Sequence, residues 1–298
     1  MGYLPFAILA YFFNAIAVIV DKFLLTSKAT NPLIVIFYIS FFSMFILLLI
    51  PFVAMPSLLV FLLASISTLV WTAGAVFLYK ALQIGLISRV IPVIGTIIPL
   101  TLLVSAIYSK SVTEMEIVAV LILILGLVFL TIFEWIGKIS PKEVIFEFLS
   151  AILFAVSYLF LREAYLHANF FTVLVWSRLI LAPVGILIVL IPVSRKMVFS
   201  GNDNSFSLFS KSGIIFLSGQ ACGGISELLI TFSVSLATPA LVNSLQGSQY
   251  LFLFIASLFL GRKFPEIFKE THTHLKTTLK VLGIASIGVG LYILAFYK

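Results

Sequence analysis

Ten long apolar stretches, separated by short polar connectors, run along this chain. Because the hydrocarbon core of a bilayer is about 30 Å thick, a helix needs roughly 20 apolar residues to cross it. Barrel strands would be about ten residues long and would alternate apolar with polar residues, unlike these runs. The sequence therefore predicts an all-α membrane protein with ten transmembrane helices. We predict the spans Tyr3–Leu25, Pro32–Ala54, Ser57–Leu82, Ile87–Ser109, Glu114–Trp135, Glu143–Tyr165, Phe170–Val193, Ser212–Leu236, Pro239–Leu260 and Thr277–Tyr297.

The composition excludes several classes of function. With 62% hydrophobic and 10% charged residues, the chain has too little polar surface to coat a soluble globule. The net charge of +7 is spread over connectors and suits anionic lipid headgroups, so we expect no nucleic acid partner. No phosphate-binding glycine loop and no catalytic constellation are present, so we predict neither an enzyme nor a cofactor. His272-Thr273-His274 is interpreted as a solvated loop, and no metal site is predicted.

The two halves of the chain resemble each other weakly but in order. Residues Ala15–Lys22 in the first span align with Val156–Glu163 in the sixth, and a charged pair ends each segment. Ile87–Pro92 aligns with Thr238–Asn243, and each opens a helix after a short connector. Five spans per copy force the second copy to insert upside down, as in many secondary transporters. We therefore predict two inverted five-helix repeats, residues 1–138 and 139–298.

A family resemblance rests on one segment above all. Tyr79–Ser88 contains an aromatic-x-Ala-Leu sequence that leads directly into a fourth helix carrying Pro99, and Gly126 lies late in the fifth span. In these features the chain resembles the EamA-like, ten-helix branch of the drug/metabolite transporter superfamily over its full length. The connector Ser109–Ser111 departs from the Gly-Glu-Arg usual there. The resemblance implies a cavity lined by helices one, three, four, six, eight and nine, with helices five and ten outside.

Two ionisable residues are predicted deep in the membrane. Arg178 in the seventh span and Glu227 in the eighth lie at matching depths, about 12–13 Å from one face. Such residues are costly in lipid and usually face a partner or a cavity. One interpretation is a structural ion pair. The other makes Glu227 a proton site or cation ligand, with Arg178 as its gate or as a substrate anchor.

The ninth span carries a stripe of amides, Asn243, Gln246 and Gln249, with Tyr250 beside it. Spacings of three residues put these amides broadly on one helical face. Such a stripe serves either interhelical hydrogen bonding or a cavity wall, and we expect the cavity wall. Weaker candidates for the same wall are Asn14, Trp71, Thr72, Tyr79, Thr96, Tyr158, Gln220 and Ser226.

Two further cations, Lys80 and Arg89, flank the short turn between the third and fourth spans. They either extend to the lipid headgroups or form a cationic rim to the pathway. If both belong to the pathway with Arg178, the pathway holds three positive charges and the one negative charge of Glu227, a surplus of two positive charges. We therefore expect a small solute that is anionic or zwitterionic.

These features predict a carrier that moves a small organic solute by alternating access, driven by a gradient, in the plasma (cytoplasmic) membrane. The alternatives are a membrane-embedded lipid-modifying enzyme and a non-transporting assembly protein. Small-residue pairs, Gly219 with Gly223 and Ser286 with Gly290, indicate close helix packing. The second pair also suits the interface of a homodimer.

Two arguments disagree on the side of the membrane that holds the termini. The family resemblance implies cytoplasmic termini. On the terminal side, however, the connectors carry only Lys110, Arg162 and Lys298, against fourteen cations on the opposite side. Because connectors rich in Lys and Arg stay in the cytoplasm, the charge pattern predicts termini outside, and we follow the charge pattern.

Overall fold

A computed structural model describes residues 2–26, 32–132, 140–192, 195, 211–261, 264 and 274–296. Within these ranges the chain is all-helical and contains no strand. Nine helical segments among the described residues are long and apolar enough to cross a membrane. The fold class is therefore that of a multi-pass α-helical membrane protein.

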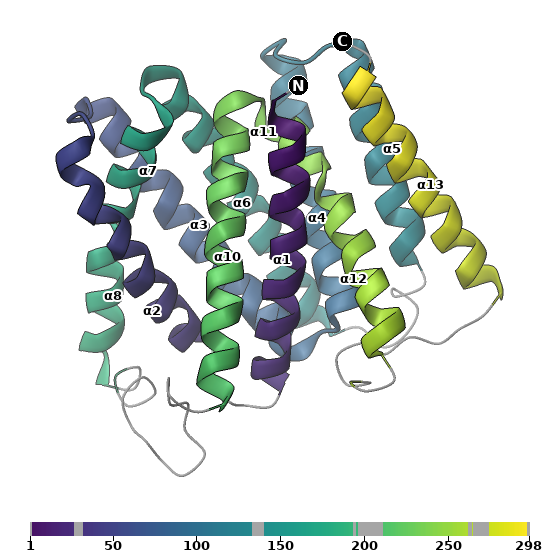
Figure 1. Ribbon diagram of the computed structural model, residues 1–298, viewed down its shortest axis with the longest axis horizontal. Coiled ribbons are helices and arrows are strands. Elements are labelled where there is room, and N and C mark those ends of the chain that lie inside the picture. Colours follow the sequence, from purple (N-terminus) through teal and green to yellow (C-terminus); the bar gives the residue numbers. More distant parts are fainter. Residues whose placement is uncertain are drawn as a thin grey trace.

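The helices follow one another up and down the bundle (Figure 1). In chain order they are α1 (Tyr3–Thr26), α2 (Pro32–Ser43), the 3-10 helix η1 (Met44–Phe52), α3 (Leu58–Ile84), α4 (Ile87–Tyr108), α5 (Glu114–Thr131), α6 (Pro141–His167), α7 (Phe170–Leu179), α8 (Leu181–Leu190), α10 (Lys211–Leu236), α11 (Pro239–Ser244), α12 (Gln246–Leu260) and α13 (His274–Phe296).

Local sequence signals set several helix starts. Ser57 accepts a hydrogen bond from the Val60 amide at 3.3 Å and begins α3. Thr113 and Glu116 form a reciprocal capping box at the start of α5. Asn169 accepts from the Thr172 amide at 2.9 Å and begins α7. Each cap satisfies an amide that has no partner within its own helix.

The ninth predicted span, Pro239–Leu260, is not one continuous helix. It divides into α11 and α12 at Leu245, where ψ is −4°. The Leu245 amide bonds to Val242 O, and Ser248 N bonds to Leu245 O, so the chain tightens locally to 3-10 pairing. Neither piece alone has the length to cross a bilayer, since they have 6 and 15 residues.

The seventh span is also divided, at Ile180, between α7 and α8. Pro183 lies in the first turn of α8 and has no amide hydrogen to offer the Leu179 carbonyl four residues earlier. The missing bond accounts for the break. The predicted boundary between the halves, near residue 138, lies outside the described residues, as do His272 and Thr273.

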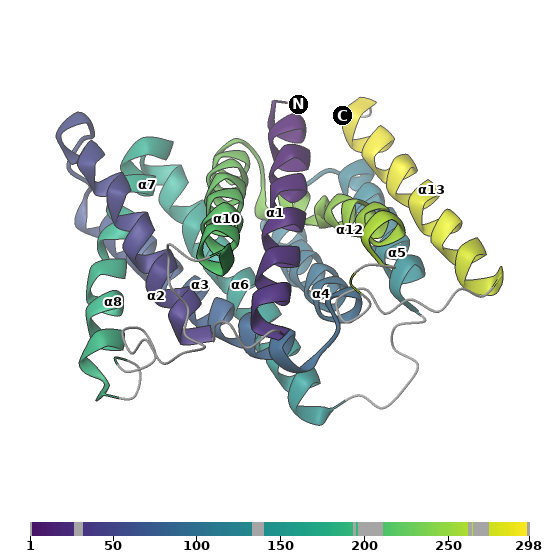
Figure 2. The same cartoon turned by 60° about the horizontal axis from the view of Figure 1, so that its bottom comes forward.

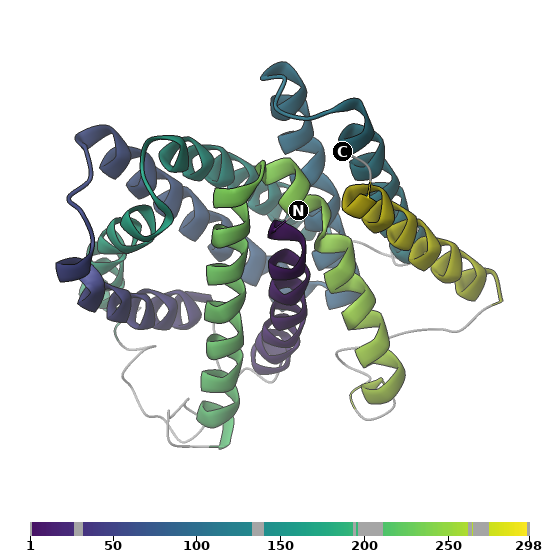
Figure 3. The ribbon, with the colours of Figure 1, turned by 45° about the horizontal axis from the view of Figure 1, so that its top comes forward.

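Three helix pairs make the most extensive contacts, namely α1 with α10, α3 with α6, and α5 with α13. Figure 3 shows α1 between α10 and α12, and in Figure 2 α5 and α13 lie together at one edge of the bundle. The start of α1 and the end of α13 lie at the same end of the molecule (Figure 1). The predicted even number of crossings requires this arrangement, and the side of the membrane stays a prediction.

Glycines allow α5 and α13 to approach within backbone contact. A Cβ added at Gly283 would lie 2.7 Å from the Gly126 carbonyl oxygen, and one at Gly126 would lie 2.9 Å from the Gly283 oxygen. A Cβ added at Gly290 would lie 2.6 Å from the Leu123 side chain of α5. Gly290 of the predicted small-residue pair therefore packs within the bundle.

We predict that Gly283→Val destabilises the protein by about 1–3 kcal/mol, because the new side chain must push two backbones apart. Gly288 is the matched control on the same helix, since a Cβ there would meet nothing within 4 Å. Thermal melting of the purified protein should drop for Gly283→Val and not for Gly288→Val. Equal melting of the two variants would contradict the close α5–α13 contact.

Candidate functional site: a polar cavity within the bundle

A cavity of about 620 Å³ lies within the helical bundle. Its wall is formed by α1, α2, η1, α3, α4, α6, α7, α10, α11 and α12, and thus by both halves of the chain. Among the described residues, α5 and α13 contribute nothing to the wall. The helix set implied by the family resemblance lacks α2 and α7, although Arg178 of α7 is itself one of the predicted pathway residues. Both helices join the lining because Ile39 and Phe42 on one side and Arg178 on the other reach the same space.

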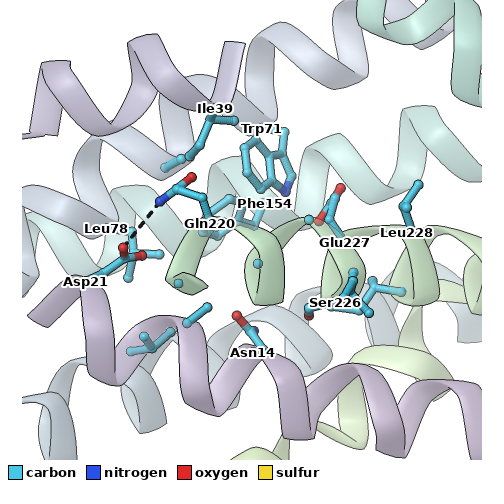
Figure 4. A pocket seen from close by; sticks show the side chains of 18 of the residues that line it. Asn14, Asp21, Ile39, Trp71, Leu78, Phe154, Gln220, Ser226, Glu227 and Leu228 are labelled. Atoms are coloured by element: carbon cyan, nitrogen blue, oxygen red, sulfur yellow. Dashed lines mark hydrogen bonds between the residues drawn. The ribbon is translucent and has the colours of Figure 1, made fainter. Parts of the chain in front are cut away.

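The structure brings nine of the twelve predicted site residues into this one wall. They are Asn14, Trp71, Tyr158, Arg178, Gln220, Glu227, Asn243, Gln246 and Gln249. Of the weaker candidates, Tyr79 and Ser226 also line it. Figure 4 shows Asn14, Trp71, Gln220, Ser226 and Glu227 around the same space.

Lys80 and Arg89 do not form a rim to the cavity. The Arg89 side chain is buried and forms an ion pair with Glu143 of α6, with Nε donating to Oε1 at 2.8 Å. Lys80 is exposed and lies over the rings of Phe77 and Phe146, at 5.5 and 5.7 Å. Of the two interpretations given for these cations, a cationic rim is not found at this cavity, because each cation already has another partner.

The amide stripe serves both functions that were considered for it. Asn14 Nδ2 donates to Gln249 Oε1 at 3.3 Å, and the Tyr11 hydroxyl donates to Asn243 Oδ1 at 3.5 Å, so α1 is linked to α11 and α12. The same amides line the cavity. Gln249 Nε2 is buried without a hydrogen-bond partner among the described residues. Tyr250, by contrast, is buried outside the cavity wall.

Arg178 and Glu227 face each other across the cavity wall, with the guanidinium 3.7 Å from Glu227 Oε1. Their side chains are 9% and 20% exposed. Arg178 Nε is buried without a hydrogen-bond partner among the described residues. Arg178 and Glu227 thus form an ion pair and also line the cavity, so the two interpretations of these residues are compatible.

Sequence reasoning missed Asp21, which also lines the cavity. Gln220 Nε2 donates to Asp21 Oδ1 at 3.4 Å (Figure 4), and Tyr79 of α3 lines the cavity beside the same carboxylate. The available signal was helical spacing, because Tyr11, Asn14 and Asp21 fall on one face of α1. Asp21 had been interpreted only as half of the charged pair that ends the span.

The expected charge of the site reverses because Lys80 and Arg89 lie outside the wall and Asp21 lies within it. The charged residues in the wall are Asp21, Glu227 and Arg178. When all three are ionised, they sum to one negative charge rather than to a surplus of two positive charges. The charge of the wall therefore no longer favours an anionic solute.

Lys22, next to Asp21, points away from it. Its Nζ donates to Leu82 O and Gly85 O, both at 2.7 Å, at the end of α3. A Cβ at Gly85 would lie 2.1 Å from Glu143 Oε1, so a larger residue there would displace the Glu143 carboxylate. Lys22, Gly85 and the Arg89–Glu143 pair thus join α1, α3, α4 and α6 at the end opposite the termini.

No protein-family model and no curated protein matches the sequence. Among solved structures, 23 chains match. One of them, described only as the crystal structure of a protein, has a TM-score of 0.64 at 13% identity. The match covers 97% of this chain and 99% of that chain. At this identity the match shows that the two chains share a fold.

We predict that Glu227→Gln lowers the stability by about 3 kcal/mol, because it leaves the Arg178 charge buried without its partner. The double variant Glu227→Gln with Arg178→Gln should regain most of that loss, since neither residue then carries a charge. Thermal melting of the three purified proteins measures both effects. A single variant that melts like the wild type would show that the two charges do not depend on each other.

Proposed function

We propose that this protein is a carrier that moves a small organic solute across a membrane by alternating access. The observation that carries the proposal is the 620 Å³ cavity, which has polar side chains from both halves of the chain. Its volume falls in the range of about 300–1,000 Å³ that is usual for organic ligands. Polar side chains inside a bilayer are costly and gather where solute or water is present.

Paired contacts at opposite ends of the bundle support two inverted repeats. Lys22 at the end of α1 donates to the last carbonyls of α3. Arg162, near the end of α6, donates to Val234 O and Ser235 O at the end of α10, at 2.9 and 3.0 Å. If α6 is the counterpart of α1 and α10 that of α3, these are two copies of one contact. Under the same correspondence the α1–α10 contact is the counterpart of the α3–α6 contact, and both contacts are extensive.

One pair breaks this correspondence in the manner that alternating access requires. Helix α3 makes many contacts with α7, whereas the counterpart pair, α10 and α2, makes no comparable contact. These two helices meet where the rings of Tyr38 and Phe216 lie 5.2 Å apart. Farther along α10, Ile225 and Leu228 are exposed and line the cavity. In a carrier, the α3–α7 pair would separate as the α2–α10 pair closes during the cycle.

The division of the ninth span supports the same function. Discontinuous helices near the middle of the membrane often form the binding sites of secondary transporters. Asn243 and Gln246 flank the break at Leu245, and both line the cavity. We extend the proposal to the EamA-like branch of the drug/metabolite transporter superfamily and to the plasma membrane, on the basis of the Tyr79–Ser88 resemblance. The energy source would be a gradient of an ion or a solute.

Accessibility from both sides of the membrane distinguishes a carrier from the alternatives. We predict that Gln246→Cys, in a Cys222→Ala background, reacts with a membrane-impermeant maleimide both in right-side-out and in inverted vesicles. Leu253→Cys and Leu258→Cys are the controls, because Leu253 is buried outside the cavity wall and Leu258 is exposed on the lipid-facing surface. Both controls should label slowly.

Reaction of Gln246→Cys from one side alone would contradict alternating access and favour a site that stays open to one face, as in a lipid-modifying enzyme. Labelling no faster than at Leu253 from either side would favour an assembly protein with a closed interior.

A further inference from the structure

We infer that Asp21 is the anionic anchor of the cavity and that it binds the ammonium group of an organic amine. The inference rests on the proposed function, since it names the class of solute for the same cavity. It replaces the expectation of an anionic or zwitterionic solute, which depended on a cationic rim.

The Asp21 carboxylate has uncharged polar neighbours on two other helices. Gln220 of α10 donates to it at 3.4 Å, and the buried Tyr79 of α3 lies beside it. The residue is 5% exposed and lines the cavity. Neither neighbour carries a positive charge that would neutralise the carboxylate.

The cation next to Asp21 in the sequence and the cation in the cavity wall both have other partners. Lys22 is bound to the Leu82 and Gly85 carbonyls, and Arg178 is paired with Glu227. Within the described ranges no cation forms an ion pair with Asp21. A buried carboxylate without a counter-charge is unfavourable, so the group either takes up a proton or pairs with a cation that enters the cavity. A cationic ligand supplies the missing charge.

The surroundings of Asp21 favour an ammonium group over a metal ion. Hard cations need several oxygen ligands, and the described residues contain no group of three acidic, His or Cys side chains that would hold a metal. An ammonium group has three N–H donors. Asp21 accepts one of them, and Gln220 Oε1 is a second acceptor on the same wall.

The rest of the cavity suits an apolar body attached to that ammonium. Trp71, Phe154 and Leu78 lie on the wall near Gln220 and Asp21 (Figure 4). Aromatic faces attract cations as well as apolar groups. Glu227 does not compete for the ammonium, because Arg178 already balances its charge. The geometry therefore points to an amine with an aromatic or aliphatic body.

A charged probe tests the carboxylate without knowledge of the natural solute. Ala17 lies one helical turn before Asp21 and lines the cavity. In a Cys222→Ala background, Ala17→Cys is treated with a cationic trimethylammonium-ethyl and an anionic sulfonato-ethyl methanethiosulfonate. The ratio of the two rate constants should fall about tenfold on adding Asp21→Asn, because a unit charge a few ångströms away changes the encounter free energy by about 1.4 kcal/mol, which corresponds to a tenfold change in rate. Asp21→Glu, which keeps the charge, should preserve the ratio.

Leu78→Cys, on the facing wall, repeats the test if Ala17→Cys does not fold. An unchanged ratio in Asp21→Asn overturns the inference alone, because the cavity is then open to water and Asp21 does not select charge. Absence of reaction at both positions overturns the proposed function and the inference with it.

The ammonium itself is tested by protection of the same cysteine. A series of phenylalkylamines should slow labelling more than the matching phenylalkanols, and Asp21→Asn should abolish the difference. Equal protection by each amine and its alcohol would overturn the assignment of the ligand class.

Discussion

The ammonium of Lys22, bound to two carbonyl oxygens at the end of α3, is the contact on which the arrangement around the cavity depends. The last carbonyls of a helix have no partner within it, and inside a bilayer they need one from elsewhere. Lys22 satisfies two of them and so fixes the end of α1 against α3. Because its charge is committed there, Asp21 next to it keeps a carboxylate directed into the cavity without a cation.

Glycines let the helices on both sides of the cavity pack closely in pairs. Gly219 lets α10 approach Val20 of α1, and Gly74 lets α3 approach Phe154 of α6. The cavity takes part of its polar lining from these two pairs and the rest from α7, α11 and α12. Gly224, five residues beyond Gly219, has no atom within 4 Å of an added Cβ, and both glycines border the cavity.

The helical spans could be predicted because length and apolarity alone decide them. The break at Leu245 could not, since the local 3-10 pairing has no signal as strong as proline. Deep polar residues such as Arg178 and Gln249 stood out because lipid makes them costly. Arg89 and Asp21 could not be placed, because they lie near span ends, where the sequence does not show which partner each charge finds. For Lys80 the sequence left the headgroups and the pathway open, and the residue is exposed outside the cavity wall. Arg89 pairs with Glu143, and Lys80 lies over the Phe77 and Phe146 rings. Asp21 lines the cavity.

Opposite movement at the two ends of the bundle is the most direct test of a carrier. Spin labels at Leu48 and Leu236 report on the end that holds the termini, and labels at Gln83 and Ile214 report on the other; all four residues are exposed. Electron–electron resonance distances should be recorded in nanodiscs, with and without the organic solute that raises the melting temperature most. The account predicts that one distance shortens as the other lengthens. A bound solute that leaves both distances unchanged, or moves them in the same direction, would contradict it.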